Sequence, residues 1–486
     1  MLIQFQHAHF ELQKKRTLSI DTLITEANQY WAFIGSNGSG KSAFSSALNE
    51  QLTLQSGSVV GLNTLTKAVV SLEEQNRIIE REAERDESDI TNEVFQGTPV
   101  IELLSEINDD INLIQHWANG FGIAHLMDEG FRKLSTGESR KVILIRALLS
   151  QAELIIFDEP FEGLDANSQR FLADTLSELH QQQQSMILIL NRLDEVPDWV
   201  THLGFLHNLS LLAQGTKASV LESETVKAFL TFNQAELNLP ERDPCSPKLS
   251  LPAGDPLFQL NQGRVAYSDR LIFKDLDWRV EPGDHWAILG PNGCGKSTLL
   301  NLISGDHPQC YANDLTVFGI KRGSGESIWD IKQHIGIISA ALQWNYKAGT
   351  NVISTVLSGL FDSIGLYSQV DEHQKNLALA WLKQVKLDHQ ANTPLHQLSY
   401  GEQRLVLICR AMIKQPALLI LDEPCQGLDE PNRQLVLGFI ELLSQQSATT
   451  LLYVTHHASD LLPCFTRRLM CVSADEAQGS TWQVQA

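Results

Sequence analysis

The chain repeats itself once, and this repeat limits what it can fold into more than any other feature. A glycine-rich segment, a segment with Leu-Ser-x-Gly-Glu and an apolar run ending in Asp-Glu-Pro each occur twice, in the same order. The pairs are Trp31–Ser42 with Trp286–Ser297, Phe131–Leu149 with His396–Ile413, and Leu154–Asp165 with Leu418–Asp429. Three elements repeated in one order predict two copies of one domain.

The stretch between the copies, residues 233–256, contains five prolines and many polar residues. Because proline cannot continue a helix, we expect a semi-extended linker between a first domain at 1–232 and a second at 257–486. In each domain a short apolar strand runs into the glycine-rich loop, a helix follows, and further apolar strands alternate with helical stretches. This alternation predicts an α/β fold around a mainly parallel, helix-covered sheet.

Composition argues against several classes of protein. The net charge of −21, from 58 acidic and 37 basic residues, disfavours bulk attraction to nucleic acid or anionic lipid. The seven cysteines form no Cys-x-x-Cys pair, so a reducing cytoplasm is expected rather than a disulfide framework or a zinc site. The sequence begins without the apolar core of a signal peptide and has no run of about 20 apolar residues that would span a bilayer. Any membrane role would need a separate partner.

Both glycine-rich segments fit the pattern G-x-x-x-x-G-K-[ST]. Glycines let the backbone curl so that its N–H groups point at phosphate oxygens, and the positive end of the following helix adds to the attraction. Lys41 and Lys296 are expected to hold the β- and γ-phosphates, and Ser42 and Ser297 to ligate Mg²⁺. A single match could be an ordinary glycine turn, but duplication between a strand and a helix favours nucleotide binding. The residues predicted to bind ATP in these loops are Gly35, Ser36, Asn37, Gly38, Ser39, Gly40, Lys41 and Ser42, and Gly290, Pro291, Asn292, Gly293, Cys294, Gly295, Lys296, Ser297 and Thr298.

Each apolar run ends in an Asp-Glu pair, at Asp158-Glu159 and Asp422-Glu423. Adjacent residues at a strand end present their side chains to different faces, so the two carboxylates can do different work. Asp158 and Asp422 suit Mg²⁺ through its water shell, whereas Glu159 and Glu423 suit orienting or deprotonating an attacking water. One such pair alone could be a capping acid. Two pairs, each after a phosphate loop, favour catalysis.

The Leu-Ser-x-Gly-Glu segments narrow the choice among families of nucleotide-binding proteins. Ser135 with Gly137, and Ser399 with Gly401, offer a hydroxyl and backbone N–H groups at a helix start, where a γ-phosphate can bind. An ordinary serine-capped helix is the alternative for either copy alone. Together the two copies resemble the L-S-G-G-Q signature of the ATP-binding-cassette (ABC) family, with Glu as the last residue. The resemblance implies two P-loop NTPase domains, each with a helical subdomain and an antiparallel β portion beside a mainly parallel core.

The resemblance also assigns residues outside the three repeated segments. The family ends its last core strand in a histidine that contacts the γ-phosphate, which His456 matches; the first half has Asn191 in an ungapped register, or Arg192 after a shift by one. The family stacks adenine on an aromatic residue upstream of the phosphate loop. Tyr267 is well placed for this and Phe10 is a weaker counterpart, although either could be an ordinary strand aromatic.

A glutamine that senses magnesium completes the family pattern. Gln75 fits this role in the first half, whereas Ala340 falls at the expected position in the second. Because Asn191 and Ala340 both depart from the pattern, we expect two unequal sites, and we expect the site of Lys296 to turn over faster.

The family pairs its two domains head to tail, so that each ATP lies between one phosphate loop and the other domain's signature. Carried over, this implies that the first loop works with Ser399 and Gly401, and the second with Ser135 and Gly137. ATP would join the two domains and hydrolysis would loosen them, giving a cycle of the switch type.

Loops outside the shared motifs resemble one bacterial subfamily, the molybdenum-transport ATP-binding proteins of the ModF type, along nearly the whole chain. These loops are Ser304–Gln309, Arg322–Gly336, Ser358–Tyr367 and Leu190–Pro197. The resemblance implies an ATPase that uses ATP and Mg²⁺ and assists molybdate uptake, with a membrane permease as partner. No residue outside the phosphate loops visibly binds an oxyanion, so molybdate rests on the resemblance alone.

Two other functions stay open. One is a soluble ATP-driven switch that acts on a cytoplasmic macromolecular complex, which the short proline-rich linker and the acidic charge disfavour. The other is a nucleotide-binding scaffold that does not hydrolyse ATP, against which both intact Asp-Glu pairs argue.

The expected head-to-tail pairing predicts that substitutions in opposite halves disable the same site. Lys296→Ala removes the ammonium group that holds the phosphates, and Ser135→Arg puts a bulky cation into the signature expected to complete that site. We expect each variant to lose the turnover of one site, and the double variant to lose no more than either single one. Steady-state ATP hydrolysis measures this, and additive losses would mean that the residues serve different sites.

Overall fold

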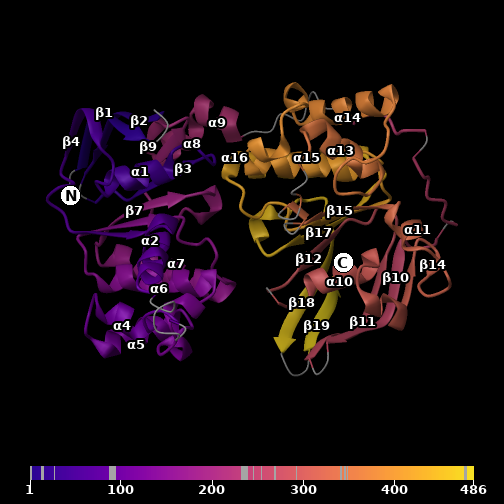
Figure 1. Cartoon of the computed structure of the whole chain (residues 1–486), viewed down its shortest axis with the longest axis horizontal. Helices are drawn as coiled ribbons and strands as arrows, with labels where there is room; N and C mark the ends of the chain where they lie inside the picture. The colour runs from indigo at the N-terminus through magenta and orange to yellow at the C-terminus, as the bar shows by residue number, and fades with distance from the viewer. Residues whose placement is uncertain are drawn as a thin grey trace. The chain divides into compact units, whose positions relative to one another are not determined.

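The computed structural model describes residues 3–12, 16–26, 28–86, 95–230, 239–244, 246–252, 254–267, 270–291, 293–339, 342–343, 346, 349–475 and 479–485. The chain divides into two compact units, residues 1–230 with 429–431 and residues 231–428 with 432–486. Figure 1 shows the first unit in indigo to magenta and the second through orange to yellow. Part of the expected linker, including residues 233–238, lies outside the described residues. Its described end belongs to the second unit, where Leu249 and Leu251 pack against the core.

The first unit is built on one mixed sheet. Its described strands are β1 (Ile3–Leu12), β2 (Arg16–Thr25), β3 (Trp31–Gly35), β4 (Leu54–Val60), β5 (Lys67–Val70), β6 (Leu154–Asp158), β7 (Ser185–Leu190), β8 (His202–His207) and β9 (Ser210–Thr216). They lie in the order β4-β1-β2-β9-β8-β3-β7-β6-β5. Pairing is parallel from β8 through β3, β7 and β6 to β5, and antiparallel where β1 meets β2 and β4.

Helices of the first unit cover this sheet and form a separate helical part. They are α1 (Lys41–Leu48), α2 (Leu72–Glu84), α4 (Val100–Ser105), α5 (Ile111–Gly120), α6 (Thr136–Leu149), α7 (Ala166–Gln181), α8 (Lys217–Glu222) and α9 (Glu224–Leu230). In Figure 1, α4 and α5 lie at the opposite end of the unit from the antiparallel strands β1, β2 and β4.

The second unit repeats this plan. Its described strands are β10 (Phe258–Tyr267), β11 (Arg270–Val280), β12 (Trp286–Leu289), β13 (Asp314–Val317), β14 (Ile320–Lys321), β15 (Ile335–Ser339), β16 (Leu418–Asp422), β17 (Thr450–Thr455), β18 (Arg467–Asp475) and β19 (Gly479–Gln485), in the order β14-β13-β10-β11-β19-β18-β12-β17-β16-β15. Its helices are α10 (Lys296–Ser304), α11 (Ile328–Lys332), α13 (Val352–Leu357), α14 (Glu372–Gln384), α15 (Tyr400–Met412) and α16 (Glu430–Gln446). Strands β18, β12, β17, β16 and β15 pair in parallel.

Both faces of each parallel core are buried, and this explains the continuous apolar runs in the sequence. In β3, Trp31 and Phe33 belong to one hydrophobic cluster, whereas Ala32 and Ile34 belong to a second cluster. A half-exposed strand would alternate apolar with polar residues, but a strand covered on both sides needs apolar residues throughout. The structure thus confirms the predicted α/β fold, with a mainly parallel core, a helical subdomain and an antiparallel β portion in each domain.

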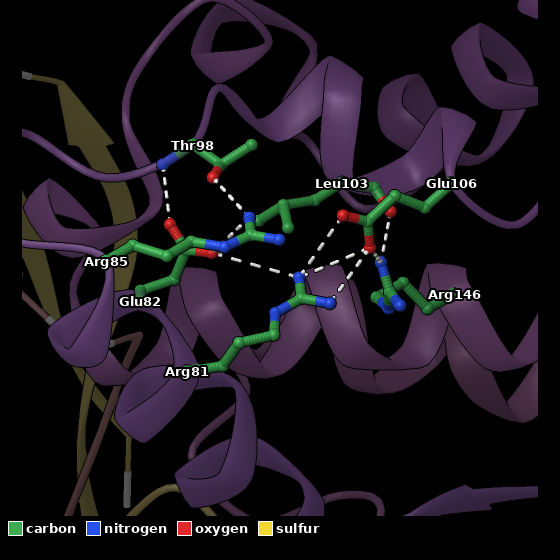
Figure 2. A network of polar contacts seen from close by, with 7 residues as sticks. All are labelled: Arg81, Glu82, Arg85, Thr98, Leu103, Glu106 and Arg146. Atoms are coloured by element: carbon green, nitrogen blue, oxygen red, sulfur yellow. Dashed lines mark hydrogen bonds and ion pairs between the residues drawn. The ribbon is translucent and has the colours of Figure 1, made fainter.

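A buried carboxylate in the first unit ties α2 to the chain that enters α4. Figure 2 shows this network of polar contacts. Glu82 is fully buried, and its Oε2 accepts a 2.6 Å hydrogen bond from the backbone N–H of Thr98. The Arg85 guanidinium lies 3.4 Å from Glu82 Oε1 and donates to Thr98 Oγ1 at 3.2 Å. A buried charge is tolerated because these donors replace the water that it has lost.

A second carboxylate extends the network to the helix that follows the first signature segment. Glu106 accepts from Arg81 of α2 at 3.2 Å and from Arg146 of α6 at 3.1 Å (Figure 2). Arg146 also donates to the carbonyl oxygen of Leu103 in α4. Helices α2, α4 and α6 are therefore joined by charge-assisted hydrogen bonds as well as by apolar packing.

The network predicts which acidic residue of α2 matters for stability. Glu82→Ala leaves the Thr98 amide without its acceptor and removes the anion beside Arg85, so we expect a loss of about 1–3 kcal/mol in the free energy of unfolding of the first unit. Glu84→Ala, at an exposed position of the same helix, is the matched control and should change it by less than about 0.5 kcal/mol. Urea unfolding of both variants measures the difference, and equal midpoints would contradict the structural role of Glu82.

Candidate nucleotide sites

The two phosphate loops have the same backbone conformation. Gly38 and Gly40 have φ angles of 77° and 106°, and Gly293 and Gly295 have 81° and 98°. This left-handed region strains any residue with a Cβ, which is why glycine stands at these places. Each loop leaves a buried parallel strand, β3 or β12, and ends where α1 or α10 begins. Of the other predicted residues, Gly35 ends β3, the two lysines and the residues after them open α1 and α10, and the rest lie in these turns, except Asn292, which is outside the described residues.

The loop lysines are almost completely buried. Lys41 Nζ donates to the carbonyl oxygens of Gly35 at 2.9 Å and Ser36 at 3.2 Å. Lys296 Nζ makes the equivalent bonds to Gly290 at 2.8 Å and to the next residue at 3.0 Å. Burial lowers the pKa of Lys41. Each ammonium group is thus held over its own loop, where phosphate oxygens would be a stronger partner than backbone carbonyls.

The predicted Asp-Glu pairs lie at the ends of β6 and β16. Register places Asp158 beside Ile189 of β7 and Asp422 beside Val454 of β17. Strand β7 lies between β6 and β3, and β17 lies between β16 and β12, with all of these pairs parallel. The carboxylates therefore reach the same edge of the sheet as the phosphate loops. In the second unit this meeting is direct, because Ser297 Oγ donates to Asp422 Oδ2 at 3.2 Å.

Asp158 has the properties of a cation ligand. Both of its carboxylate oxygens are buried, and Ser45 offers them a hydrogen bond that only partly offsets this burial. Burial, and then the neighbouring charge of Glu159, raise the pKa of Asp158 to about 7. Burial likewise raises the pKa of Asp422, although the hydrogen bond from Ser297 opposes it. Carboxylate and hydroxyl oxygens are hard ligands that suit Mg²⁺.

The glutamate next to each aspartate has a strained backbone. Glu159 and Glu423 have φ angles of 52° and 49°, in the left-handed region that residues with a Cβ seldom adopt. Their N–H groups donate across the sheet to Ile189 and Val454, at 2.8 and 3.0 Å. Strain of this kind persists only where the surrounding structure enforces it, and it often marks a functional residue.

The surroundings of these two glutamates differ. In the first unit, burial and a hydrogen bond with the carboxyl group of Glu162 raise the pKa of Glu159 to about 7. In the second unit, burial raises the pKa of Glu423, but the hydrogen bond and charge of His456 and the charge of Lys296 outweigh it and hold the pKa below its ordinary value. His456 Nδ1 lies 3.1 Å from Glu423 Oε1. The surroundings of Glu159 therefore favour its neutral form, whereas those of Glu423 favour the carboxylate.

Sheet register also identifies the residue that stands in the place of His456. Because Asp158 pairs with Ile189 and Asp422 with Val454, two residues further along each strand lie Asn191 and His456. Of the two alternatives for the first half, the register favours Asn191. Arg192 instead forms an ion pair with Asp194 at 2.9 Å.

In each half a glutamine contacts the start of the signature helix. The amide of Gln75, which was expected to sense magnesium, donates to Thr136 O at 3.2 Å and Ser139 Oγ at 2.7 Å, at the start of α6. Gln343 makes the matching contact in the second unit, donating to Tyr400 O at 3.1 Å. Ala340 lies outside the described residues.

Sequence reasoning missed Gln343, although a signal was present. Strands β5 and β15 are each followed or ended by a serine, Ser71 and Ser339, and a glutamine stands four residues after each serine. Gln343 Oε1 is buried and accepts no hydrogen bond from the described residues. Both halves therefore carry a glutamine between the strand edge and the signature helix, and the glutamine position does not distinguish them.

The signature serines cap their helices, as the simpler interpretation of these segments predicted. Ser135 accepts from the N–H of Glu138 at 3.3 Å, and its own N–H and hydroxyl donate to Glu138 Oε2 at 2.8 and 2.7 Å. Ser399 and Glu402 make the same reciprocal cap. The glutamate that differs from the family signature therefore has a structural role. Gly137 and Gly401 follow in the first turns of α6 and α15.

A residue that sequence reasoning did not single out links the first signature helix to the Asp-Glu pair. Arg140 of α6 is buried and donates from Nη2 to the carbonyl oxygens of Asp158 at 2.7 Å and Glu159 at 2.9 Å. These bonds hold the end of β6 against α6. The arginine in the second signature segment, Arg404, is also buried and donates to Tyr400 Oη at 3.3 Å.

A cavity of about 850 Å³ lies beside the second phosphate loop. Tyr267 and Thr298 line it, together with Ser297 and Asp422. The Tyr267 side chain is 50% exposed, so its ring face is open to a base, and its Oη lies 2.8 Å from His307 Nε2.

The first half has no matching ring at this place among its described residues. Phe10, the weaker candidate, is buried in the core with its ring 6.2 Å from that of Phe5. The last residue of β1 is Leu12, where β10 ends in Tyr267.

Comparison with known proteins decides the family. A family model described as ABC transporter matches residues 19–162 and 273–426, which include both phosphate loops, both signature segments and both Asp-Glu pairs. The chain belongs to the ABC transporter family. It carries two ATP-binding-cassette domains in tandem, and no described helix is long and apolar enough to cross a membrane.

Relatives of this tandem ABC protein match it over most of its length. It is 44% identical to the ABC transporter ATP-binding protein ModF of Escherichia coli K12, over 96% of each chain. An uncharacterized ABC transporter ATP-binding protein of Schizosaccharomyces pombe is 30% identical over 73% of this chain and 71% of its own. The sequence resemblance to the ModF type is thereby confirmed.

Solved structures show the same tandem fold. An RNase-L inhibitor aligns with 98% of this chain and 90% of its own, with a TM-score of 0.69 at 16% identity. An archaeal ribosome recycling factor, solved in complex with a ribosomal stalk protein, covers 98% and 89% with a TM-score of 0.68, also at 16% identity. At this identity the likeness concerns the fold alone.

The raised pKa of Asp158 predicts how stability depends on pH. An unfolded Asp has a pKa near 3.8 and the folded one a pKa of about 7, so the folded state holds a proton that the unfolded state has lost between these values. Asp158 therefore lowers the free energy of unfolding only slightly below pH 4, and lowers it by up to about 4 kcal/mol above pH 7.

Removal of this buried charge should stabilise the nucleotide-free, metal-free ABC protein. We expect Asp158→Asn to raise the melting temperature more at pH 8 than at pH 5. Asp128→Asn, at an exposed position, is the control and should shift neither value. Calorimetry at the two pH values measures this, and an equal gain at both would contradict a titrating Asp158.

Proposed function

We propose that this chain is an ATPase with two unequal nucleotide sites, and that it works as the accessory ATPase of molybdate uptake with a membrane permease as partner. The observation that carries the ATPase proposal is the duplicated edge at which a phosphate loop, an aspartate at the end of a strand and a strained glutamate meet. The ModF-like sequence over 96% of the chain supports the transport role.

The residues of each half divide the work of hydrolysis. Loop N–H groups with Lys41 or Lys296 bind and neutralise the phosphates, so the charge that develops in phosphoryl transfer meets fixed positive partners. Tyr267 would stack on adenine in the second half. The signature residues Ser135, Gly137, Ser399 and Gly401 would offer their helix N-termini to a γ-phosphate.

Proton transfer falls to the two strained glutamates. Glu159 or Glu423 would accept a proton from the attacking water, and His456 would hold Glu423 in its ionised form. Mg²⁺ would supply positive charge that offsets the charge of the phosphates. The residues that would hold it are Ser42 and Asp158, and Ser297 and Asp422, while the Gln75 and Gln343 amides join this edge to the signature helices.

Electrostatics supports unequal turnover of the two sites. A carboxylate is a better proton acceptor than a carboxyl group, and the surroundings of Glu423, unlike those of Glu159, favour the carboxylate. The first half has Glu162 beside Glu159, and the corresponding place in the second half holds the neutral Gln426. The asymmetry therefore rests on Glu162 and on the exchange of Asn191 for His456, since both halves have a glutamine.

We expect Glu423→Gln to reduce steady-state ATP hydrolysis more than Glu159→Gln does. Both variants exchange a carboxyl group for an isosteric amide, so they form a matched pair. General-base loss costs about 10²–10⁴-fold at the affected site. The faster site dominates turnover, so loss of Glu423 should remove most of the rate. Equal residual rates in the two variants would contradict unequal sites.

Affinity capture tests the physiological role. The Glu159→Gln/Glu423→Gln chain, loaded with ATP, is used as bait against detergent-solubilised membranes and against cytosol, with Lys41→Ala/Lys296→Ala as the matched control that cannot hold nucleotide. ATP-dependent capture of a permease supports transport at the inner face of the membrane. Capture of ribosomes or of another cytoplasmic complex instead would favour a soluble ATP switch.

A further inference from the structure

A cysteine of the second phosphate loop, Cys294, lies near a cysteine of β18, Cys471. Strand β12 pairs in parallel with β18, with Leu289 beside Met470. The next residues of the two strands are Gly290, which opens the loop, and Cys471. A Cβ added at Gly290 would lie 2.7 Å from Cys471 Cβ and 2.8 Å from Cys294 Sγ. The glycine thus leaves a space that both cysteine side chains enter.

The two cysteine side chains lie beside the same space and differ in exposure. Both are free cysteines, and each approaches the position that a Cβ at Gly290 would take. Cys294 is fully buried in the loop, whereas Cys471 is partly exposed and its Sγ donates to Ser473 O at 3.3 Å. Burial, and then the adjacent Cys471, raise the pKa of Cys294 to about 12. Spontaneous oxidation is therefore slow at neutral pH, because a thiolate is the reactive form.

The first phosphate loop has no such pair. Ser39 stands where the second loop has Cys294, and Leu206, beside Gly35, stands where β18 has Cys471. The two halves therefore differ in one chemical respect at an otherwise repeated place. Any oxidation of this kind would act on one nucleotide site only.

We propose that Cys294 and Cys471 form a reversible disulfide that closes the second nucleotide site under oxidising conditions. The oxidant is a low-molecular-weight disulfide. The exposed Cys471 sulfur attacks it after losing a proton and releases one small thiol. The Cys294 sulfur, deprotonated in turn, attacks the Cys471 sulfur and releases the second small thiol. Two cysteine thiols become one disulfide, and the small disulfide becomes two thiols that take up the two protons.

The bond would act on the loop through its geometry. A disulfide fixes the sulfurs about 2.0 Å apart, which is closer than thiols in contact, so it pulls Cys294 towards β18. Cys294 precedes Gly295, whose φ of 98° shapes the turn, and lies two residues before Lys296. A shift of this segment misdirects the N–H groups that bind phosphate. Formation of the bond is independent of the proposed function, whereas its effect on nucleotide rests on that function.

The experiment uses the full chain with Lys41→Ala, so that nucleotide binding reports the second loop. The protein is incubated with oxidised glutathione, blocked with N-ethylmaleimide and digested without reduction. We expect a peptide pair linked through Cys294 and Cys471, together with affinity for a fluorescent ATP analogue that is about tenfold weaker and restored by dithiothreitol. With Cys471→Ala added, oxidation should leave the affinity unchanged. With Cys464→Ala, another partly exposed cysteine, the link should still form.

Each other result overturns the proposal. Glutathione retained on Cys471 without the linked peptide would show that the two sulfurs do not reach each other. Oxidative loss of affinity in the Cys471→Ala chain would assign the effect to another residue. A linked peptide with unchanged nucleotide affinity would refute closure of the site, and because the peptide is detected by mass, this outcome is distinct from a failure to bind or hydrolyse ATP.

Discussion

The parallel pairing of the central strands is the interaction on which both sites depend. Strand β3 lies beside β7, and β7 beside β6, so a phosphate loop, Asn191 and the Asp158-Glu159 pair reach one edge of one sheet. The second unit repeats this with β12, β17 and β16. Side chains on both faces of these strands are buried, so the backbone hydrogen bonds between the strands are shielded. Polar groups that are far apart in sequence can then sit at fixed separations.

Burial at this edge does chemical as well as structural work. It lowers the pKa of Lys41 and raises that of Asp158, because a low-dielectric surrounding disfavours either charge alone. The free-energy cost of burying these charged groups would be offset when nucleotide phosphates bind beside Lys41 and a cation binds beside Asp158. Similar burial gives different results for the two glutamates, since Glu159 meets another carboxyl group and Glu423 meets His456. Repetition of a fold thus does not repeat its electrostatics.

The helical part of each domain is joined to the edge by a few polar bonds. Gln75 and Gln343 reach the first turns of the signature helices, and Arg140 holds the end of β6. In the first unit, the buried carboxylate of Glu82 and the exposed carboxylate of Glu106 then join α2, α4 and α6 (Figure 2). A displacement at the phosphate edge would therefore be passed to the helical part as a whole, because charge-assisted bonds resist independent movement of single helices.

The sequence by itself determined the duplication, the α/β class, the phosphate loops and the Asp-Glu pairs, because each is a local pattern whose residue types follow from backbone geometry or ligand chemistry. Tertiary structure decided what depends on register and burial. It showed that Gln343 makes in the second half the contact that Gln75 makes in the first, and it placed Phe10 in the core. Residues that are distant in sequence set these outcomes, and the contact of His456 with Glu423 likewise contributes to the pKa difference between Glu159 and Glu423. No single segment carries that information.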